Sequence, residues 1–535
     1  MKALKNVTIV LFIFLLSSGT SSIYAQEEIL NVLDKWIEWS DGENMLIHHL
    51  NQQAFTYLDA RDKEVENLST RADWVNRQKK IKDILLEVIG PFPEKTPLNT
   101  KIMGVVQKDG FRIEKIVYES MPNFYVTACL LIPDGSNEKN KTPAIIQVSG
   151  HGFPALRSPI NSKEIYNLVK KGFIVLAIDP IGQGERIQYW DEEKKTSLVG
   201  ISTSEHSFLG NQMFLCGISP LRYFIWDGIR GIDYLMTRKE VDPDRIGIYG
   251  VSGGGTQTTF ISAFDERVKA ASPGCYITSF RRLLQSIGAQ DAEQNIYQAI
   301  KKGLTHGDLL QVRAPGSLMI SSNTRDFFSI QGAVETYEET IKAYKAFGKE
   351  ENISQVIADA GHGIHINTDV PPYYVRNSKN IYAFFQKVFK IPGNEEEIPL
   401  EGIDQEDFRV TPTGQLSTSL GGETAFSINK KESQKLLSEI IASRSNPDKH
   451  FRNVAVKAKE ISGYIAPPEE VKSVFRGRYQ RDGYAVEMHA LHGEGDYVIP
   501  MLLFIPEGNN IKPGLIYVNP EGKITDASPG GKIEQ

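Results

Sequence analysis

One serine stands in a setting that suits nucleophilic chemistry. The segment Gly250-Val251-Ser252-Gly253-Gly254 fits the pattern G-x-S-x-G, in which the serine occupies a sharp turn between a strand and a helix. The apolar run before it predicts the strand, and Thr256–Glu266 predicts the helix. Glycines suit this turn because a Cβ beside the serine would crowd the neighbouring backbone. The short pattern is common by chance, so the prediction that Ser252 is a nucleophile depends on finding its partners.

A histidine and an aspartate follow at positions that suit such a serine. A serine hydroxyl is a poor nucleophile at neutral pH, so it needs a base that an acid in turn orients. Asp326 follows the predicted strand at 317–321, and His362 lies between two glycines after the predicted strand at 355–357. The order serine, acid, histidine is the one expected for this kind of turn. We predict that Asp326 orients His362 and that His362 is the base.

Other readings of these residues stay open. His365 is the rival base, and Asp359 is the rival acid, although Asp359 is very near His362 in the same loop. An aspartate after a strand is often a helix N-cap, and a histidine in a loop is often simply solvated.

The tetrahedral intermediate of such a reaction needs hydrogen-bond donors for its oxyanion. The backbone N–H of Gly253 is one expected donor, because it follows the nucleophile. The loop Gly150-His151-Gly152-Phe153-Pro154 follows an earlier predicted strand, and we assign the second donor to Phe153, with Gly152 as the alternative. We expect His151 to be a packing and turn residue, because it precedes the nucleophile in the chain.

The elements that must position these groups alternate between strand and helix from residue 110 to about residue 390. Short apolar runs predict strands, and segments with helical spacing lie between them. This alternation predicts an α/β fold with a mostly parallel sheet and helices on both faces. Ligands of such sheets bind at the carboxyl ends of the strands, which is where the candidate residues lie.

Residues 110–390 resemble the α/β-hydrolase superfamily and are close to its bacterial acetyl xylan esterase and dienelactone-hydrolase-like branches. The resemblance implies a Ser/Asp/His hydrolase that needs no cofactor and that acts on esters of plant cell-wall polysaccharides. The G-C-S-R-x-G elbow typical of glucuronoyl esterases is missing. The stretches that carry the resemblance are Gly150–Pro154, Asp179–Arg186, Gly250–Thr258 and Thr324–Phe328.

Few residues point to the substrate. Arg186 and Arg325 lie at predicted strand ends and are candidates for binding a uronate carboxylate, although ion pairs with nearby acids are the favoured alternative. Trp190 is a candidate for stacking on a sugar. Glu293 lies in a polar patch of a predicted insertion and is a candidate for lining the substrate site.

Residues 1–25 have the pattern of a secretory signal. Lys2 and Lys5 precede the apolar run Val7–Leu16, and small residues follow up to an expected cleavage after Ala25. The run is too short to span a bilayer, and no cysteine follows it to carry a lipid anchor. We therefore expect a periplasmic or secreted protein, with a buried N-terminal helix as the alternative.

Composition excludes several function classes. The chain has 535 residues and a net charge of −6, which argues against general binding to nucleic acid or to a membrane surface. Its three cysteines, Cys129, Cys216 and Cys275, do not suggest a disulfide framework. No Cys/His cluster has metal-ligand spacing along the sequence, so we expect no metal site.

An internal repeat predicts more than one domain. Asp109-Gly110-Phe111 matches Asp482-Gly483-Tyr484, and Pro133 matches Pro506 at the same offset of 373 residues. Pro143–Val148 matches Pro513–Val518 after a shorter loop. The chain ends within this second copy, which favours a fragment of a longer tandem protein over a degenerate remnant. We predict a helical lead-in at 26–100, a catalytic domain at 101–393, a linker at 394–429 and a partial, non-catalytic second copy at 430–535.

The sequence thus predicts an exported serine esterase that removes acetyl or methyl groups from an esterified polysaccharide. A serine peptidase of the prolyl-oligopeptidase type is the first alternative, although no blade-like repeat of strands precedes the elbow. A non-catalytic, sugar-binding relative is the second.

Overall fold

The computed structural model describes residues 28–362, 373–399, 403–466, 470–508 and 510–535. The predicted signal at 1–25 and the rival base His365 lie outside these residues. The chain forms two compact units, Gln53–Asn453 and a second one that combines Met1–Gln52 with Val454–Gln535.

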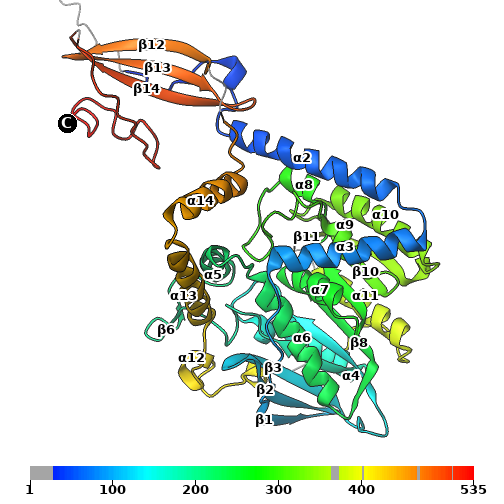
Figure 1. Cartoon of the computed structure of the whole chain (residues 1–535). Helices are drawn as coiled ribbons and strands as arrows, with labels where there is room; N and C mark the ends of the chain where they lie inside the picture. The colour runs from blue at the N-terminus through cyan, green and yellow to red at the C-terminus, as the bar shows by residue number, and fades with distance from the viewer. Residues whose placement is uncertain (1–27, 363–372, 400–402, 467–469, 509) are drawn as a thin grey trace, which may run out of the picture. The chain divides into compact units, whose positions relative to one another are not determined.

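The larger unit is built around a nine-stranded sheet with the strand order β1-β2-β3-β5-β4-β8-β9-β10-β11 (Figure 1). The six strands from β5 to β11 in this order are parallel to one another, whereas β1, β2 and β3 pair antiparallel at one side. The predicted mostly parallel sheet is therefore confirmed, although strands begin earlier than expected. Their bounds are β1 Lys101–Lys108, β2 Phe111–Met121, β3 Phe124–Pro133, β4 Thr142–Val148, β5 Ile174–Ile178, β8 Val241–Val251, β9 Val268–Gly274, β10 Ser317–Arg325 and β11 Ile353–Gly361.

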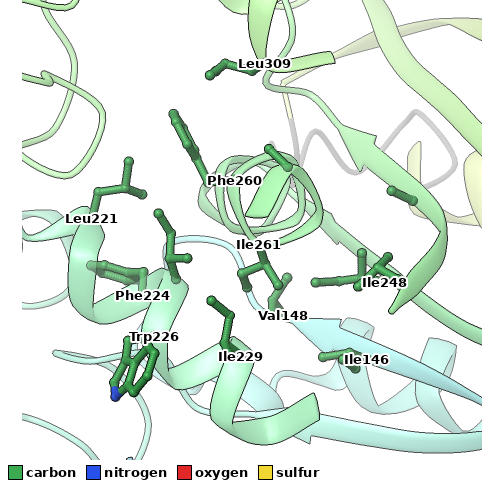
Figure 2. Packing of buried hydrophobic residues seen from close by; sticks show 14 of the residues in the cluster. Ile146, Val148, Leu221, Phe224, Trp226, Ile229, Ile248, Phe260, Ile261 and Leu309 are labelled. Carbon is green, nitrogen blue, oxygen red and sulfur yellow. The ribbon is translucent and has the colours of Figure 1, made fainter. Parts of the chain in front are cut away.

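Helices cover both faces of this sheet, as predicted. Successive side chains of a strand point to opposite faces, so Ile146 of β4 packs with one buried cluster and Ile145 with the other. Figure 2 shows the first cluster, where Ile261 of α7 lies between the helix α6 and the strand residue Val148. The first face carries α3 (Arg71–Ile89), α6 (Leu221–Thr237), α7 (Gly253–Phe264) and α10 (Ile330–Ala346); the second carries α4 (Pro159–Lys170) and α11 (Tyr373–Phe389).

The N-terminal helices are held against the core of the larger unit by a buried ion cluster. Arg61 of α2 (Met45–Glu66) and Arg77 of α3 both donate to Asp308, at 2.9 and 2.6 Å. Asp308 lies in α9 (His306–Gln311) and its side chain is fully buried. Its two arginine partners hold the pKa of this carboxyl below its ordinary value against the opposing effect of burial. The predicted lead-in helices thus pack on the core.

The segment predicted as a linker at 394–429 is packed against the same core. Phe408 and Val410 are buried in the cluster on the α4–α11 face. The Glu185 carboxylate accepts hydrogen bonds from the backbone N–H groups of Val410 and Thr411, at 2.6 and 2.8 Å. Buried apolar side chains and a buried carboxylate thus hold the described part of this segment against the core.

Further helices and the two-stranded sheet of β6 and β7 lie outside the nine-stranded sheet. Among the described residues, no helix combines the length and the apolar composition needed to cross a bilayer. These elements are η1 Ile37–Trp39, η2 Ala155–Arg157, β6 Trp190–Asp191, β7 Thr196–Ser197, α5 Thr203–Leu215, α8 Phe280–Leu284, η3 Glu350–Asn352, η4 Gln405–Phe408, α12 Leu416–Ser419, α13 Ala425–Ser443 and α14 Pro447–Ser462.

The smaller unit contains a three-stranded antiparallel sheet, β12 (Ser473–Arg481), β13 (Tyr484–His492) and β14 (Val498–Pro506). Its pairing repeats that of β1, β2 and β3 at the offset found in the sequence. Phe111 pairs with Pro133 and Tyr484 pairs with Pro506. The pairing irregularity between Ile102 and Gly104 returns between Phe475 and Gly477.

The correspondence stops after β14. Pro513–Val518, which the sequence matched to the strand at 143–148, forms no strand, and Leu515, Ile516 and Val518 are exposed. An apolar strand needs a paired neighbour for its backbone and a covered face for its side chains. The described part of the smaller unit gives this segment neither.

Candidate active site

Ser252 lies between the end of β8 and the start of α7, in a strained backbone conformation with φ of 59° and ψ of −122°. A non-glycine residue at positive φ is uncommon and is found where the surrounding structure enforces it. The enforcing contacts are close. A Cβ at Gly250 or at Gly254 would lie 2.4 or 2.3 Å from the carbonyl oxygen of Val148. The glycines of the predicted turn are therefore required by the approach of β4.

The structure brings Ser252, His362 and Asp326 together. His362 Nε2 lies 2.9 Å from Ser252 Oγ, and His362 Nδ1 lies 2.8 Å from Asp326 Oδ1. The serine follows β8, the aspartate follows β10 and the histidine follows β11, so all three lie at the carboxyl ends of parallel strands. This is the arrangement that the sequence predicted.

The surroundings of His362 fix both its ring and its acid partner. The Asp326 side chain is 2% exposed, and its Oδ1 also accepts a hydrogen bond from the N–H of Phe328 at 2.9 Å. The Phe327 ring lies 4.0 Å from the imidazole ring, between centroids. Asp359, the rival acid, is exposed and instead pairs with Arg325 at 3.1 Å.

The loop expected to supply an oxyanion donor lies directly against the serine. A Cβ at Gly150 would be 3.4 Å from the Cβ of Ser252. The Gln183 side-chain amide donates to the carbonyls of Gly150 and Gly152, at 2.7 and 2.9 Å. The carbonyl of Phe153 accepts from the N–H of Gly184 at 2.9 Å. These hydrogen bonds hold the loop through its carbonyl groups. Gly253, the residue expected to supply the other oxyanion donor, is the first residue of α7.

His151, which we expected to be a packing and turn residue, contacts two acidic side chains and lies against Gly253. Its ring covers Gly253, because a Cβ at that glycine would lie 2.6 Å from His151 Nε2. His151 Nε2 lies 2.6 Å from Glu293 Oε1, and His206 Nδ1 lies 3.3 Å from Glu293 Oε2. Asp291 Oδ2 lies 3.4 Å from the other ring nitrogen of His151. His151 is thus one member of a polar cluster beside the serine.

Electrostatics bind this cluster together. Burial opposes ionisation of Glu293, but the two imidazoles outweigh it and hold the pKa of this carboxyl well below its ordinary value. Burial by itself would lower the pKa of His206. The Glu293 carboxylate outweighs this effect, so the pKa of His206 is raised above its ordinary value. Sequence analysis missed His206, because the residues are far apart in the chain and no local spacing links them.

The four residues predicted to bind substrate differ in burial and in their hydrogen-bond or ion-pair partners. The Arg186 side chain is 1% exposed and pairs with Asp227 at 2.7 Å, so the structure does not support a role in binding substrate. Glu293 is 3% exposed and faces two histidines, so its predicted place in the substrate-site lining is also unsupported. Arg325 is exposed beside Asp359, and Trp190 is half-buried with its indole N–H donating to Glu192 at 2.7 Å.

The segment that contains the serine turn and the loop at Gly150–Pro154 is similar to known proteins. Residues 98–309 match the model of the acetyl xylan esterase family, AXE1. The chain is 25% identical over 209 residues to the Bacillus subtilis (strain 168) protein named "Putative hydrolase YtaP". This match covers 36% of this chain and 62% of that protein. The matched part therefore spans less than two thirds of this relative's length.

Solved structures with similar backbones carry esterase names. Methylesterase BT1017 is 22% identical with a TM-score of 0.48, and the match covers 74% of this chain and 80% of that one. A glucuronoyl esterase from Solibacter usitatus is 14% identical with a TM-score of 0.44, over 60% of this chain and 94% of that one. The match to the family model covers the loop at Gly150–Pro154, the loop at Asp179–Arg186 and the serine turn, so this segment of the chain is similar to the acetyl xylan esterase family.

Proposed function

We propose that this chain is a carboxylic ester hydrolase in which Ser252 is the nucleophile. The observation that carries the proposal is the position of His362, which bridges Ser252 Oγ and Asp326 Oδ1 at 2.9 and 2.8 Å. A hydroxyl, an imidazole and a carboxylate in this order form the arrangement that activates a serine for acyl transfer. The match to the acetyl xylan esterase family supports the choice of an ester as substrate.

The reaction follows from the geometry. His362 Nε2 accepts the proton of Ser252 as Oγ attacks the ester carbonyl carbon, and the carbonyl oxygen becomes an oxyanion. His362 then gives this proton to the leaving alcohol as the C–O bond breaks, which leaves an acyl group on Ser252. Water attacks the acyl group with the same base, and the acid is released. Asp326 holds the Nδ1–H of His362 and stabilises the imidazolium.

The oxyanion would be stabilised by backbone donors next to the serine. The Gly253 N–H stands at the N-terminus of α7, where the helix dipole favours negative charge. The loop at Gly150–Pro154 lies against the serine and is the source proposed for the second donor, from Phe153. Removing one such donor typically slows turnover by about 10²–10³-fold.

We further propose that the substrate is an acetyl or methyl ester on a plant cell-wall polysaccharide and that the protein is exported. The family description supports the acetyl ester, and the name of one solved structure, a methylesterase, accords with the methyl ester. The signal-like pattern of residues 1–25 supports export.

Labelling with a fluorophosphonate probe tests the nucleophile. We expect wild-type protein to be labelled at Ser252 and the Ser252→Ala variant to show no label. Hydrolysis of an aryl acetate should fall in this variant by on the order of 10⁴-fold or more. Equal labelling of both proteins, or no labelling of the wild type, would exclude the proposed chemistry.

A substrate panel tests the class of ester. Acetylated xylan, methyl-esterified pectin and an aminoacyl-proline peptide would be offered to the same protein, with Ser252→Ala as the blank. Release of acetate or methanol is expected. Cleavage of the peptide alone would replace the esterase proposal with a peptidase.

A further inference from the structure

We propose that His151, His206 and Glu293 bind one divalent transition-metal ion, for which Zn²⁺ is the best-suited candidate, beside the serine turn. One ligand atom from each of these residues lies within 4.8 Å of the other two. Two imidazoles and a carboxylate form a donor set that suits Zn²⁺ and related ions.

In each histidine, one ring nitrogen contacts an oxygen atom outside the three proposed ligands, and the other ring nitrogen faces Glu293. His206 Nε2 lies 2.9 Å from the carbonyl oxygen of Ile181, which leaves Nδ1 toward the carboxylate. His151 Nδ1 lies 3.4 Å from Asp291 Oδ2, and its Nε2 faces Glu293. Metal-binding histidines have this pattern, because a carbonyl or carboxylate on the far nitrogen fixes the tautomer and turns the lone pair to the ion.

Two of the inner atoms of the cluster lack hydrogen bonds. His206 Nδ1 and Glu293 Oε2 are buried and form no hydrogen bond, although they lie 3.3 Å apart. The side chains of His206 and Glu293 are 0% and 3% exposed. A buried polar atom without a partner costs free energy, and a cation bound to both atoms would satisfy them together.

Distances and charge also suit an ion. A tetrahedron with Zn²⁺ bonds of about 2.0–2.1 Å has ligand atoms roughly 3.3 Å apart. The separation of His206 Nδ1 from Glu293 Oε2 is 3.3 Å, whereas that of His151 Nε2 from Glu293 Oε1 is 2.6 Å and must widen by a fraction of an ångström. Neutral imidazoles with the carboxylates of Glu293 and Asp291 carry two negative charges, which a divalent cation balances.

The ion would connect three distant segments at the serine. His151 belongs to the loop at Gly150–Pro154, His206 to α5 and Glu293 to the segment between α8 and α9. His151 also covers Gly253. The partly exposed side chains of His151 and Asp291, at 16% and 27%, give the ion a route from solvent. A bound ion would thus stiffen the loop that faces the nucleophile.

Metal binding can be measured without any assay of hydrolysis. Full-length protein would be stripped with a chelator, dialysed, and titrated with Zn²⁺ in competition with a chromophoric chelator. We expect one equivalent to bind. Glu293→Gln should weaken binding by at least about 100-fold, and Asp291→Asn, which removes only the outer partner of His151, by about 10- to 100-fold. Titration with Co²⁺ should give the visible absorption of a four-coordinate ion.

Control variants separate this site from surface binding. His450→Ala removes a half-buried histidine elsewhere in the chain and should leave the stoichiometry and affinity unchanged. Circular dichroism would check that each variant is folded. If Glu293→Gln does not fold, Asp291→Asn serves instead, because Asp291 is partly exposed. Failure of the wild type to bind one equivalent, or equal affinity in wild type and the folded variant, would overturn the proposal.

Discussion

Two arginines that look alike in the sequence illustrate how burial decides the role of a residue. Arg186 is buried, pairs with Asp227, and donates to the carbonyls of Tyr125 and Asp179 at 3.1 and 3.0 Å. Among the residues that the structure describes, Arg325 at the end of β10 contacts the carboxylate and the backbone carbonyl of the exposed Asp359. Removing one partner of a buried ion pair strongly destabilises the folded protein, whereas an exposed ion pair contributes little to its stability.

Replacing each arginine by alanine should therefore give very different stabilities. Arg186→Ala leaves the buried Asp227 carboxylate without its cation, and we expect a loss of about 3–5 kcal/mol in the free energy of unfolding. Arg325→Ala is the matched control and should change this free energy by less than about 1 kcal/mol. Thermal unfolding followed by calorimetry measures both. Similar losses for the two variants would show that the buried pair is not what stabilises the fold.

The sequence predicted the residues that depend on strand ends and missed those that depend on side-chain packing. Ser252, Asp326 and His362 follow apolar runs, and parallel strands bring such ends to one edge, so their meeting could be inferred. His206 lies in a segment without clear periodicity and Glu293 lies in a separate predicted insertion, so no local pattern shows that the two side chains meet. The burial of Arg186 was equally hidden, because its partner Asp227 lies on a different element.

At the scale of elements, the turn between β8 and α7 is fixed by backbone contact with β4. A Cβ at Gly254 would lie 2.3 Å from Val148 O and 3.1 Å from Gly150 N, and neither is a flexible side-chain atom. Gly254→Ala must therefore move the turn or the loop at Gly150–Pro154. Because a displacement of about 1 Å in a reacting group costs about 10²-fold, we expect hydrolysis of an aryl ester to fall by at least that factor.

A second glycine provides the control for this substitution. A Cβ at Gly104 of β1 would meet only the Cδ of Lys115, at 3.8 Å, which is an ordinary contact. Gly104→Ala should therefore leave hydrolysis unchanged. Wild-type activity in Gly254→Ala would mean that the close approach of β4 is unnecessary for placing Ser252.

The contact between α4 and α11 predicts a pH-dependent stability. Glu164 of α4 is buried and accepts a hydrogen bond from Ser378 Oγ of α11 at 2.8 Å. Burial raises the pKa of Glu164 from 4.5 to about 7. Between these two values the folded protein binds more protons than the unfolded chain, so the free energy of unfolding falls as the pH rises. The fall attributable to Glu164 is about 3 kcal/mol over the whole window.

Replacing this carboxyl removes its titration and keeps an acceptor for Ser378. Glu164→Gln should therefore lose stability less steeply than the wild type between pH 4.5 and about 7. Glu338→Gln, an exposed change in α10, should keep the wild-type slope. Denaturant unfolding at a series of pH values gives the comparison. Parallel curves for wild type and Glu164→Gln would show that Glu164 ionises normally in the folded state.

At the scale of the whole molecule, the internal repeat predicted a partial second copy of the first domain from residue 430 onward. The strands that the structure has there, β12, β13 and β14, pair at the offset of the sequence match. The repeat did not predict that the buried cluster of these strands would include Val32 and Trp39, from the other end of the chain. Such a contact depends on tertiary packing between segments more than 400 residues apart, as the hydrogen bond from Arg476 to the Val32 carbonyl illustrates.

The division into two compact units predicts that the smaller one can be disrupted without loss of hydrolysis. Val32 is fully buried, so Val32→Asp places a charge without a partner in the core beneath β12–β14. We expect faster hydrogen exchange in residues 473–506, while turnover of an aryl acetate, which we propose to depend on Ser252 in the larger unit, stays at the wild-type level. Ile37→Asp in the same segment is the control, because Ile37 is 91% exposed and should tolerate the charge. Loss of hydrolysis in Val32→Asp alone would show instead that the two units fold as one cooperative structure.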